Sequence, residues 1–230
     1  SPRICHINHN RAMCGRFVLF TSELLDQVGK LPGIKEVHAP DGVPGPRYNI
    51  APTMMVPVIR VQESLAQVDP GRWGLLPHWK KDLEGPPLFN ARGETVASKP
   101  SFRDAYKGTN GSGRCVIPMN GYYEWHEKVP NYVTRSDGEL MWVAGLWATG
   151  LDRLSATMVT TEALEPMDWL HNRLPRFLTE EEIRPWLTGS MDEQLLQPTP
   201  KQLRELFEVR PVDKAVGNVK NDYPELIAQS

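Results

Sequence analysis

The sequence predicts a single α+β domain, built around a mainly antiparallel sheet or open barrel with a few peripheral helices. Most strand-like segments follow one another directly, without the βαβ alternation that a parallel sheet requires. The 21 prolines and seven tryptophans indicate short elements that are joined by fixed turns and separated by aromatic contacts. The hydrophobic fraction of 40% and the charged fraction of 23% are ordinary for a globular domain.

The strands are predicted from runs of β-branched and apolar residues bounded by turn residues. Ser136, Asp137 and Gly138 are typical turn residues and predict a hairpin between the segments that flank them. We expect irregular structure over 32–49 and 77–99. The expected strands are 54–61, 72–75, 114–118, 121–126, 131–135, 140–148 and 156–161.

Few helices are expected, and each has a start signal. Ser22 would cap a short helix that ends at Gly29. Thr179 and Glu182 have the spacing of a capping box, which predicts a helix reaching about residue 187. Pro200 suits the first turn of another helix, which would continue through 207, and 101–107 favours a single helical turn.

The composition limits the setting and the partners of the protein. No apolar run has the length of a membrane span, and no signal peptide is visible, so we expect no membrane association. Three cysteines are an odd number without framework spacing, which favours a reducing interior and hence the cytoplasm, or the nucleoid in a bacterium. The net charge of −2 is incompatible with a uniformly basic surface, so a nucleic-acid site would be a local cluster of arginines.

Residue types near the amino end suit zinc. Cys5, His6, His9 and Cys14 could supply four ligands, but their spacing fits no common zinc pattern. We therefore expect no metal and no other cofactor. Nothing in the sequence requires more than a monomer.

Cys14 is the most informative residue because it directly follows Met13. Removal of everything before Cys14 would leave an α-amine and a thiol on neighbouring carbons. Such an aminothiol can condense with an aldehyde through nitrogen and sulfur together, which an internal cysteine cannot do. Residues 1–12 precede this pair and would block the amine. The alternative is that Cys14 is a small buried hydrophobe, as most free cysteines are.

Three further residues are candidates for catalysis. Glu124 lies among aromatic residues on an expected strand, where desolvation would favour its protonated form and suit it to acid–base chemistry. The alternative is a strand carboxylate that faces water. His171 follows a strand and could move a proton or donate to an oxyanion, or serve only as a structural histidine. Asn90 could orient a nucleophile through its amide, or satisfy loop backbone.

Four arginines and two tryptophans lie in or beside these segments. The planar guanidinium group matches phosphate oxygens, and an exposed indole ring can stack on a base. Taken singly, arginines are usually solvated and tryptophans usually belong to the core. Only the grouping therefore favours binding of nucleic acid. The residues are Arg16, Arg92, Arg103, Arg173, Trp73 and Trp79.

Eight motifs, in this order, resemble those of the SOS-response-associated peptidase (SRAP) family. The resemblance runs from Met13 to about Asn221, so that the boundaries would be a leader over 1–12 and a domain over 13–225. The motifs are Met13-Cys14-Gly15-Arg16-Phe17, Tyr48-Asn49-Ile50-Ala51-Pro52, Trp73-Gly74-Leu75-Leu76-Pro77-His78-Trp79, Asn90-Ala91-Arg92-Gly93-Glu94-Thr95, Arg114-Cys115-Val116-Ile117-Pro118, Gly121-Tyr122-Tyr123-Glu124-Trp125, His171-Asn172-Arg173-Leu174-Pro175 and Val216-Gly217-Asn218-Val219.

The resemblance implies an open barrel-like fold with a basic groove that binds single-stranded DNA. Members cross-link to abasic sites through an N-terminal cysteine, which forms a Schiff base and then a thiazolidine, and so shield these sites during the damage response. The family name also implies peptidase activity, and Schiff-base chemistry implies lyase activity. Cys14 matches the nucleophile, Asn90 the residue that positions its amine, Glu124 the proton-transferring carboxylate and His171 the histidine near the sugar.

The remaining positions match less uniformly. Arg16, Arg92 and Arg173 match arginines that hold phosphates, Arg103 is a weaker match, and Trp73 or Trp79 would help to bend the strand. Two departures occur in the histidine motif, where Asn172 replaces an aspartate and Leu174 replaces a methionine, and Arg176 follows where an apolar residue is commoner.

The leader leaves alternatives open. Met13 could be the true start, or residues 1–13 could be a propeptide that is cut before Cys14, with the Cys14 thiol attacking the Met13 carbonyl. Two rival functions also remain: a thiol peptidase that uses Cys14, His171 and Glu124, and a DNA-binding module without chemistry.

Overall fold

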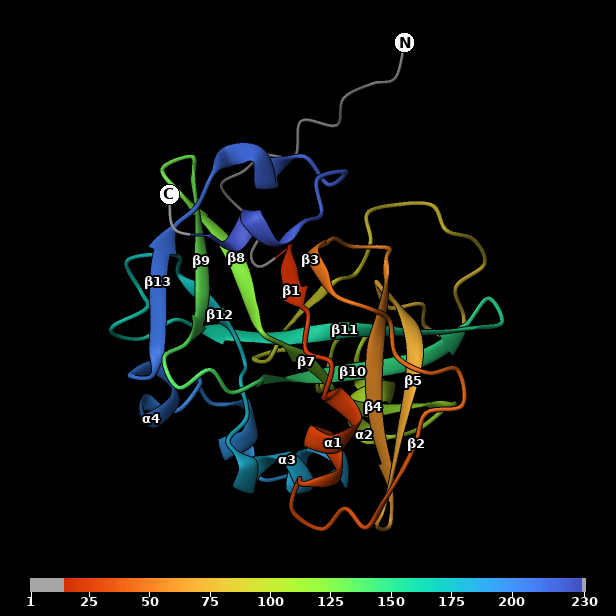
Figure 1. Ribbon diagram of the computed structural model, residues 1–230. Helices are drawn as coiled ribbons and strands as arrows, with labels where there is room; N and C mark the ends of the chain where they lie inside the picture. Colours follow the sequence, from red (N-terminus) through yellow and green to blue (C-terminus); the bar gives the residue numbers. More distant parts are fainter. Residues whose placement is uncertain (1–14, 229–230) are drawn as a thin grey trace.

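The computed structural model describes residues 15–228, which form two β-sheets with short helices at their margins (Figure 1). The first sheet has the order β13 (Phe207–Pro211), β9 (Val129–Arg135), β8 (Gly121–His126), β1 (Phe17–Leu19) and β3 (Arg47–Ile50). The second has the order β12 (Arg173–Pro175), β11 (Arg153–Glu162), β10 (Met141–Gly150), β7 (Ser112–Met119), β4 (Met55–Gln62), β5 (Leu65–Trp73) and β2 (Glu36–His38), and β6 (Asn90–Arg92) joins it beside β11.

The second sheet curls until two of its strands meet. β11 pairs in parallel with β5 through Ser155–Arg72 and Ala156–Trp73, so that β5, β4, β7, β10 and β11 form a closed ring. Most other pairings are antiparallel. The predicted α+β class with a mainly antiparallel, barrel-like core is therefore confirmed.

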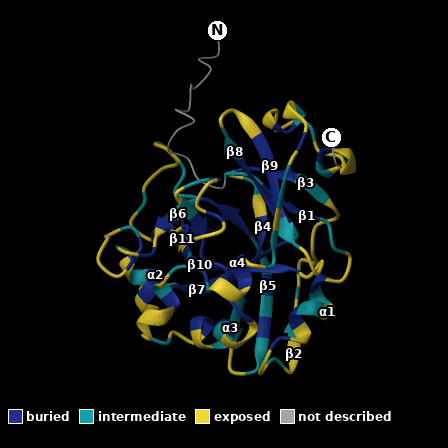
Figure 2. Cartoon of the chain, turned by 90° about the vertical axis from the view of Figure 1, so that its left-hand side faces the viewer, coloured by how far each residue is buried: buried dark blue, intermediate teal, exposed yellow. Residues whose placement is uncertain are grey.

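Aliphatic and aromatic residues of the central strands and of α3 form one buried core cluster. Figure 2 shows the buried stretches of these strands in dark blue. Trp186 from α3 is fully buried, and its Nε1 donates to the carbonyl groups of Cys115 and Gly145, which joins this helix to β7 and β10. The helical elements are α1 (Leu24–Gly29), α2 (Arg103–Lys107), α3 (Glu180–Leu187), α4 (Lys201–Arg204) and the 3₁₀ turns η1 (Glu193–Leu196), η2 (Lys214–Gly217) and η3 (Pro224–Ile227).

Two helix predictions need correction. Glu23, not Ser22, occupies the N-cap position of α1. The helix after Pro200 ends at Arg204, because the chain turns there to give Phe207 to β13, where it pairs with Arg135. The capping box of α3 is confirmed: Glu182 Oε1 accepts from the Thr179 amide at 3.0 Å.

The predicted hairpin around Asp137 is wrong, although the turn itself is present. Gly138 has φ of 75° and donates to the Arg135 carbonyl at 3.1 Å. The strands on either side belong to different sheets, since β9 pairs with β8 and β13 whereas β10 pairs with β7 and β11. The turn therefore carries the chain from one sheet to the other. Strands β2, β3 and β6 also lie in segments that were expected to be irregular.

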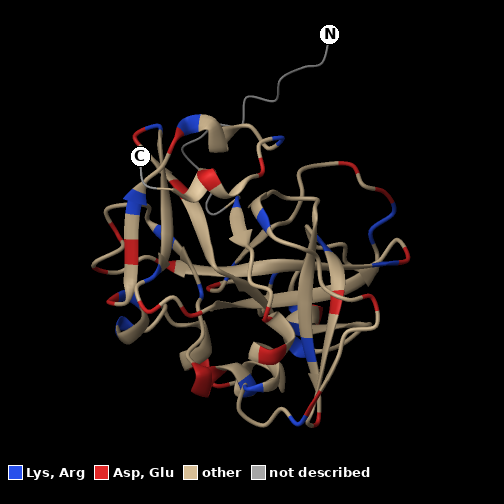
Figure 3. Cartoon of the chain, viewed as in Figure 1, with Lys and Arg blue, Asp and Glu red and all other residues tan. Residues whose placement is uncertain are grey.

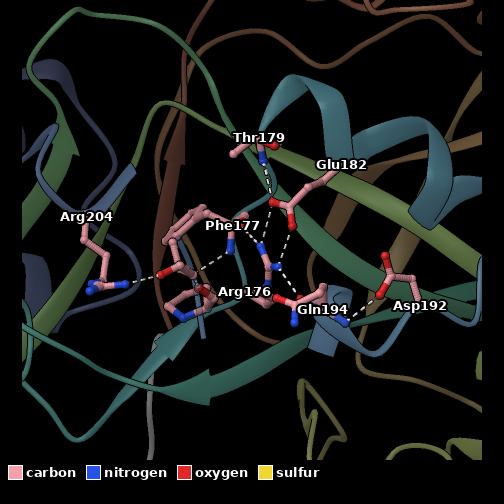
Figure 4. A network of polar contacts seen from close by, with 9 residues as sticks. Arg176, Phe177, Thr179, Glu182, Asp192, Gln194 and Arg204 are labelled. Carbon is pink, nitrogen blue, oxygen red and sulfur yellow. Dashed lines mark hydrogen bonds and ion pairs between the residues drawn. The ribbon is translucent and has the colours of Figure 1, made fainter. Parts of the chain in front are cut away.

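A buried ion pair holds β12 against α3 (Figure 4). The Arg176 guanidinium donates to both carboxylate oxygens of Glu182, at 2.9 and 2.6 Å, and to the carbonyl groups of Phe177 and Gln194. Arg176 is only 1% exposed. Arg176, which directly follows the histidine motif in the sequence, is thus fixed by hydrogen bonds to α3 and to neighbouring backbone.

Charged residues of both signs are interspersed over the described chain (Figure 3). In residues 15–228, no helix combines the length and the apolar character needed to cross a bilayer.

Candidate functional site

The start of β1 leads towards Glu124. β1 pairs antiparallel with β8, Phe17 lies opposite Tyr122, and the Tyr123 amide donates to the Arg16 carbonyl at 3.0 Å. One further step of this register sets Gly15 opposite Glu124. Cys14, the predicted nucleophile, lies outside the described residues.

Gly15 also lies next to the segment that carries Asn90. A methyl group added to Gly15 would be 3.7 Å from Phe89 Cε2, and Phe89 directly precedes Asn90 at the start of β6. β6 pairs in parallel with β11, with Asn90 beside Met158. The predicted partners Asn90 and Glu124 therefore approach the start of β1 from different sheets.

Two aromatic contacts define the face of β8 on which Glu124 lies. Tyr122 contacts Phe177 with ring centroids 5.8 Å apart, and His126 contacts Trp169 at 5.3 Å. Alternate residues of a strand share a face, so Glu124 lies between these two contacts and faces the segment 169–177. Glu124 is 3% exposed. The carboxylate is thus withdrawn from water and faces the segment that contains His171.

A backbone hydrogen bond orients the imidazole of His171. The Arg173 amide donates to Nδ1 at 3.0 Å, so the neutral ring carries its proton on Nε2. Burial lowers the pKa of His171 below its ordinary value, and the positive charge of Arg173 lowers that pKa further against the opposing effect of the hydrogen bond. At neutral pH the ring is therefore an uncharged donor through Nε2.

We expect NMR titration of His171 to give a midpoint below about 6.5, its ordinary pKa. Because the folded pKa is lower than the unfolded pKa, the unfolded state binds this proton first as the pH falls. His171 then contributes stability that is present above about pH 6.5 and is lost below it, as the pH falls through the folded pKa. His171→Gln would assign the resonance and remove this part of the pH dependence, and a midpoint above 6.5 would contradict the assignment of a buried neutral ring.

Arg92 and Arg173 flank the same strand, β11. Arg92 lies beside Thr160 on one edge, and Arg173 lies opposite Glu162 on the other. Both arginines line a cavity of about 550 Å³. The cavity is lined by Arg92, Glu94, Glu162, Ala163, Asp168, Asn172 and Arg173.

Arg16 is less free than its predicted role suggests. Its guanidinium donates to Asn49 Oδ1 at 3.2 Å and to the carbonyl groups of Val216 and Gly217, at 2.7 and 3.2 Å. Burial lowers its pKa. The buried Asn49 side chain donates to three carbonyl groups of the same carboxyl-terminal segment. Arg16 therefore holds this segment against the start of β1.

The two predicted tryptophans have different environments. Trp73 is 0% exposed, contacts Phe17 and Phe89 edge to face, and donates from Nε1 to the Phe89 carbonyl at 3.0 Å. Its ring has no free face for a base, which corrects the prediction of a direct DNA contact. Trp73 instead packs against Phe17 of β1 and against Phe89, which directly precedes Asn90. Trp79 is 50% exposed on the loop after β5.

Arg103 lies on a segment that contacts the loop carrying Trp79. It is the first residue of α2, and its neighbour Asp104 is 3.8 Å from His78, the residue before Trp79. The segments that carry Arg103 and Trp79 are therefore neighbours, and both residues are exposed.

Cys115 cannot substitute for Cys14 as a nucleophile. It is fully buried in β7, and burial raises the pKa of its thiol far above the ordinary value. The proposed zinc ligands Cys5, His6, His9 and Cys14 all lie outside the described residues. Among residues 15–228, no group of three or more histidine, cysteine, aspartate or glutamate side chains is arranged to hold a metal ion.

These features define a class of protein: an α+β barrel-like domain whose first strand leads to a buried carboxylate, a neutral histidine and an asparagine. A family model described as SOS response associated peptidase (SRAP) matches residues 13–219. The chain belongs to this family.

Two bacterial relatives of the chain are both named abasic site processing proteins. The chain is 35% identical to the abasic site processing protein YoqW of Bacillus subtilis (strain 168), with 94% of this chain and 99% of that protein covered. It is 31% identical to the abasic site processing protein YedK of Escherichia coli (strain K12), with the same coverage. A crystal structure of a Bordetella bronchiseptica protein shares the fold, with a TM-score of 0.70 at 24% identity over 87% of this chain and all of that one.

The sequence reasoning missed two features of the site. Glu94 was quoted in a motif but given no role, although an acidic residue two positions after Arg92 is a signal of possible pairing. Trp169, which is 51% exposed and contacts His126, was not singled out either. No local pattern indicates that contact, because it joins two segments over 40 residues apart in the sequence.

Proposed function

We propose that this protein binds single-stranded DNA and forms a covalent thiazolidine cross-link with abasic sites through Cys14. The observation that carries the proposal is the convergence on the start of β1, where Arg16 pairs with Tyr123, the residue before Glu124, and Gly15 lies beside Phe89, the residue before Asn90. Names of the relatives YoqW and YedK, both abasic site processing proteins, support the same substrate. The cross-link would protect the site during the DNA damage response.

The reaction balances with the loss of one water. The α-amine of Cys14 adds to the C1′ aldehyde of the ring-opened sugar, and the resulting hydroxyl leaves as water to give a Schiff base. The Cys14 thiol then adds to the imine carbon, its proton passes to nitrogen, and the five-membered ring closes. No oxidant, metal or cofactor takes part.

Each neighbouring residue has a task in this sequence. The Glu124 carboxyl group, which is buried, would protonate the departing hydroxyl. The Asn90 amide would hold the amine towards the aldehyde. His171, with its proton on Nε2, would donate to the sugar oxygen.

The DNA strand would be held by a local cluster of arginines rather than by a uniformly basic surface. Arg92 is 61% exposed at the cavity and Arg173 lies across β11 from it. Arg16 would contribute by holding the carboxyl-terminal segment against the start of β1. Trp79 and Arg103 would contact the DNA strand at a distance from this cavity. Neutralising several phosphates makes such binding strongly dependent on salt.

The reaction requires a free α-amine on Cys14. Residues 1–13 must therefore be absent from the active form, through use of Met13 as the start and its removal, or through cleavage before Cys14. Attack of the Cys14 thiol on the Met13 carbonyl would accomplish the second route and would account for the word peptidase in the family name.

The decisive test combines an abasic single-stranded oligonucleotide with the protein and separates the products on a denaturing gel. A heat-stable band of one protein per DNA is expected, only from protein whose intact mass shows Cys14 as its first residue. A chain that retains Ser1 and still forms the heat-stable adduct would refute the aminothiol mechanism. Cleavage of peptides by a chain with a blocked Cys14 amine would favour the thiol peptidase instead.

A further inference from the structure

Glu94 lies between the two arginines that are proposed to hold DNA at this cavity. The Arg173 guanidinium donates from Nη1 and Nη2 to the two Glu94 oxygens, both at 2.8 Å. Arg92 Nε is 3.9 Å from Glu94 Oε2, the oxygen that Arg173 Nη2 also contacts. One carboxylate therefore lies against two cations, and the three side chains together keep a net charge of +1.

The backbone brings these three side chains together. Gly93 donates to the Thr160 carbonyl at 2.8 Å, and a Cβ at Gly93 would be 3.1 Å from Thr160's neighbour Thr161 and 3.2 Å from the Thr160 oxygen. The absence of a side chain lets the turn after β6 press against β11. Arg92 and Glu94, on either side of Gly93, are thereby held close to Arg173 on the opposite edge of β11.

The Glu94 carboxylate is ionised at neutral pH. Partial burial opposes its ionisation, but the hydrogen bonds from Arg173 and the charges of Arg173 and Arg92 hold the pKa of Glu94 below its ordinary value. A carboxylate and a phosphate present the same pair of oxygens to a guanidinium fork. Glu94 is therefore chemically similar to the phosphate that these arginines would bind.

Arg173 cannot bind a phosphate through its fork while Glu94 occupies that fork. Its side chain is only 13% exposed, and Nη2 also donates to the backbone and side-chain oxygens of Thr160, at 2.9 and 3.1 Å. Glu94 is 43% exposed at the cavity, so its side chain has room to turn towards solvent.

We infer that Glu94 is an exchangeable counter-ion that occupies the Arg173 fork in free protein and gives way to a DNA phosphate on binding. The inference rests on the proposed function. Glu94 thus weakens binding to an undamaged strand and keeps Arg173 oriented before DNA arrives. Neutralising Glu94 should therefore tighten such binding and add about one effective phosphate contact.

The test measures binding of an undamaged, fluorescently labelled single strand by anisotropy over a series of salt concentrations. Glu94→Gln keeps the shape and removes the charge, and should lower Kd about fivefold at low salt, as expected for release of one partly exposed ion pair. The slope of log K against log salt should steepen by about 0.7, the value for one phosphate of single-stranded DNA.

Two further variants make the result specific. Glu162→Gln removes a carboxylate from the same cavity but leaves the Arg173 fork on Glu94, and should give a clearly smaller change. Arg173→Gln in the Glu94→Gln background should cancel the gain. Thermal unfolding of each variant, measured beside the wild type, would show that all are folded.

The outcomes separate this inference from the function on which it rests. A wild type that binds no single-stranded DNA at low salt would overturn the proposed function and this inference with it. A wild type that binds, with Glu94→Gln equal or weaker, would overturn only the inference and leave Glu94 as a permanent positioning partner of Arg173. An equal gain from Glu162→Gln would overturn it too, because charge alone would explain the effect.

Discussion

Cys14→Ala should form no heat-stable adduct with abasic single-stranded DNA. The alanine chain, once its α-amine is free, can still make a Schiff base, but no sulfur is present to close the ring. The imine hydrolyses, so the band should vanish on heating and reappear only when borohydride reduces the imine before denaturation. Cys14→Ser should behave similarly, since a hydroxyl is a far weaker nucleophile than a thiol near neutral pH.

Cys115 provides a matched control. Cys115→Ala removes a buried thiol that cannot ionise at neutral pH and leaves Cys14 unchanged. This variant should cross-link at the wild-type rate, as judged by the denaturing gel. A heat-stable band from Cys14→Ala would contradict the thiazolidine, and undiminished binding with no band from the wild type would leave a DNA-binding module without chemistry.

Arg176→Met should lower the free energy of unfolding by about 3–5 kcal/mol, the usual cost of removing one partner from a buried ion pair. The substitution leaves the Glu182 carboxylate without its guanidinium and removes the donor to the carbonyl groups of Phe177 and Gln194. In a chain of this size the midpoint of thermal unfolding should fall by roughly 10 °C.

A surface pair provides the comparison. Lys201 and Glu205 are 75% and 59% exposed at 3.6 Å, so Lys201→Gln should change the free energy of unfolding by less than about 1 kcal/mol. Denaturant unfolding followed by tryptophan fluorescence would measure both. A loss below about 1 kcal/mol for Arg176→Met would mean that methionine packs in this position as well as the ion pair does, as apolar replacements of buried pairs sometimes do.

The sequence alone predicted the parts of the fold that depend on local pattern. The capping box of α3 and the alternation along β8, which sets Tyr122, Glu124 and His126 on one face, are properties of neighbouring residues. Pairing between distant segments is not visible in this way. The turn at Asp137 has the composition of a hairpin, but the partners of β9 and β10 are chosen by strands elsewhere in the chain.

The candidate site likewise has features that the sequence predicts and features that depend on contacts between distant segments. The residue types of Asn90, Glu124 and His171 indicated chemistry, and the order of the motifs indicated a family. The burial of Trp73 and the fork of Arg173 on Glu94 depend on which side chains meet in three dimensions. A tryptophan or an arginine has the same letter in the core, on the surface or in an ion pair, so exposure could not be predicted from the motif.

β11 contributes no proposed catalytic residue. Its main chain nevertheless bonds to both the segment that carries Asn90 and the segment that follows His171, and so holds the two segments apart at a fixed distance. On one edge its amide at Met158 donates to Phe89 O and its carbonyl at Thr160 accepts from Gly93. On the other edge its Val159 carbonyl accepts from the Arg176 amide, and its continuation at Ala163 donates to Asn172 O. Alanine substitutions within β11 keep the main-chain groups that make these bonds. Amide hydrogen exchange along 158–163 would therefore report loosening of the site that side-chain substitution cannot detect.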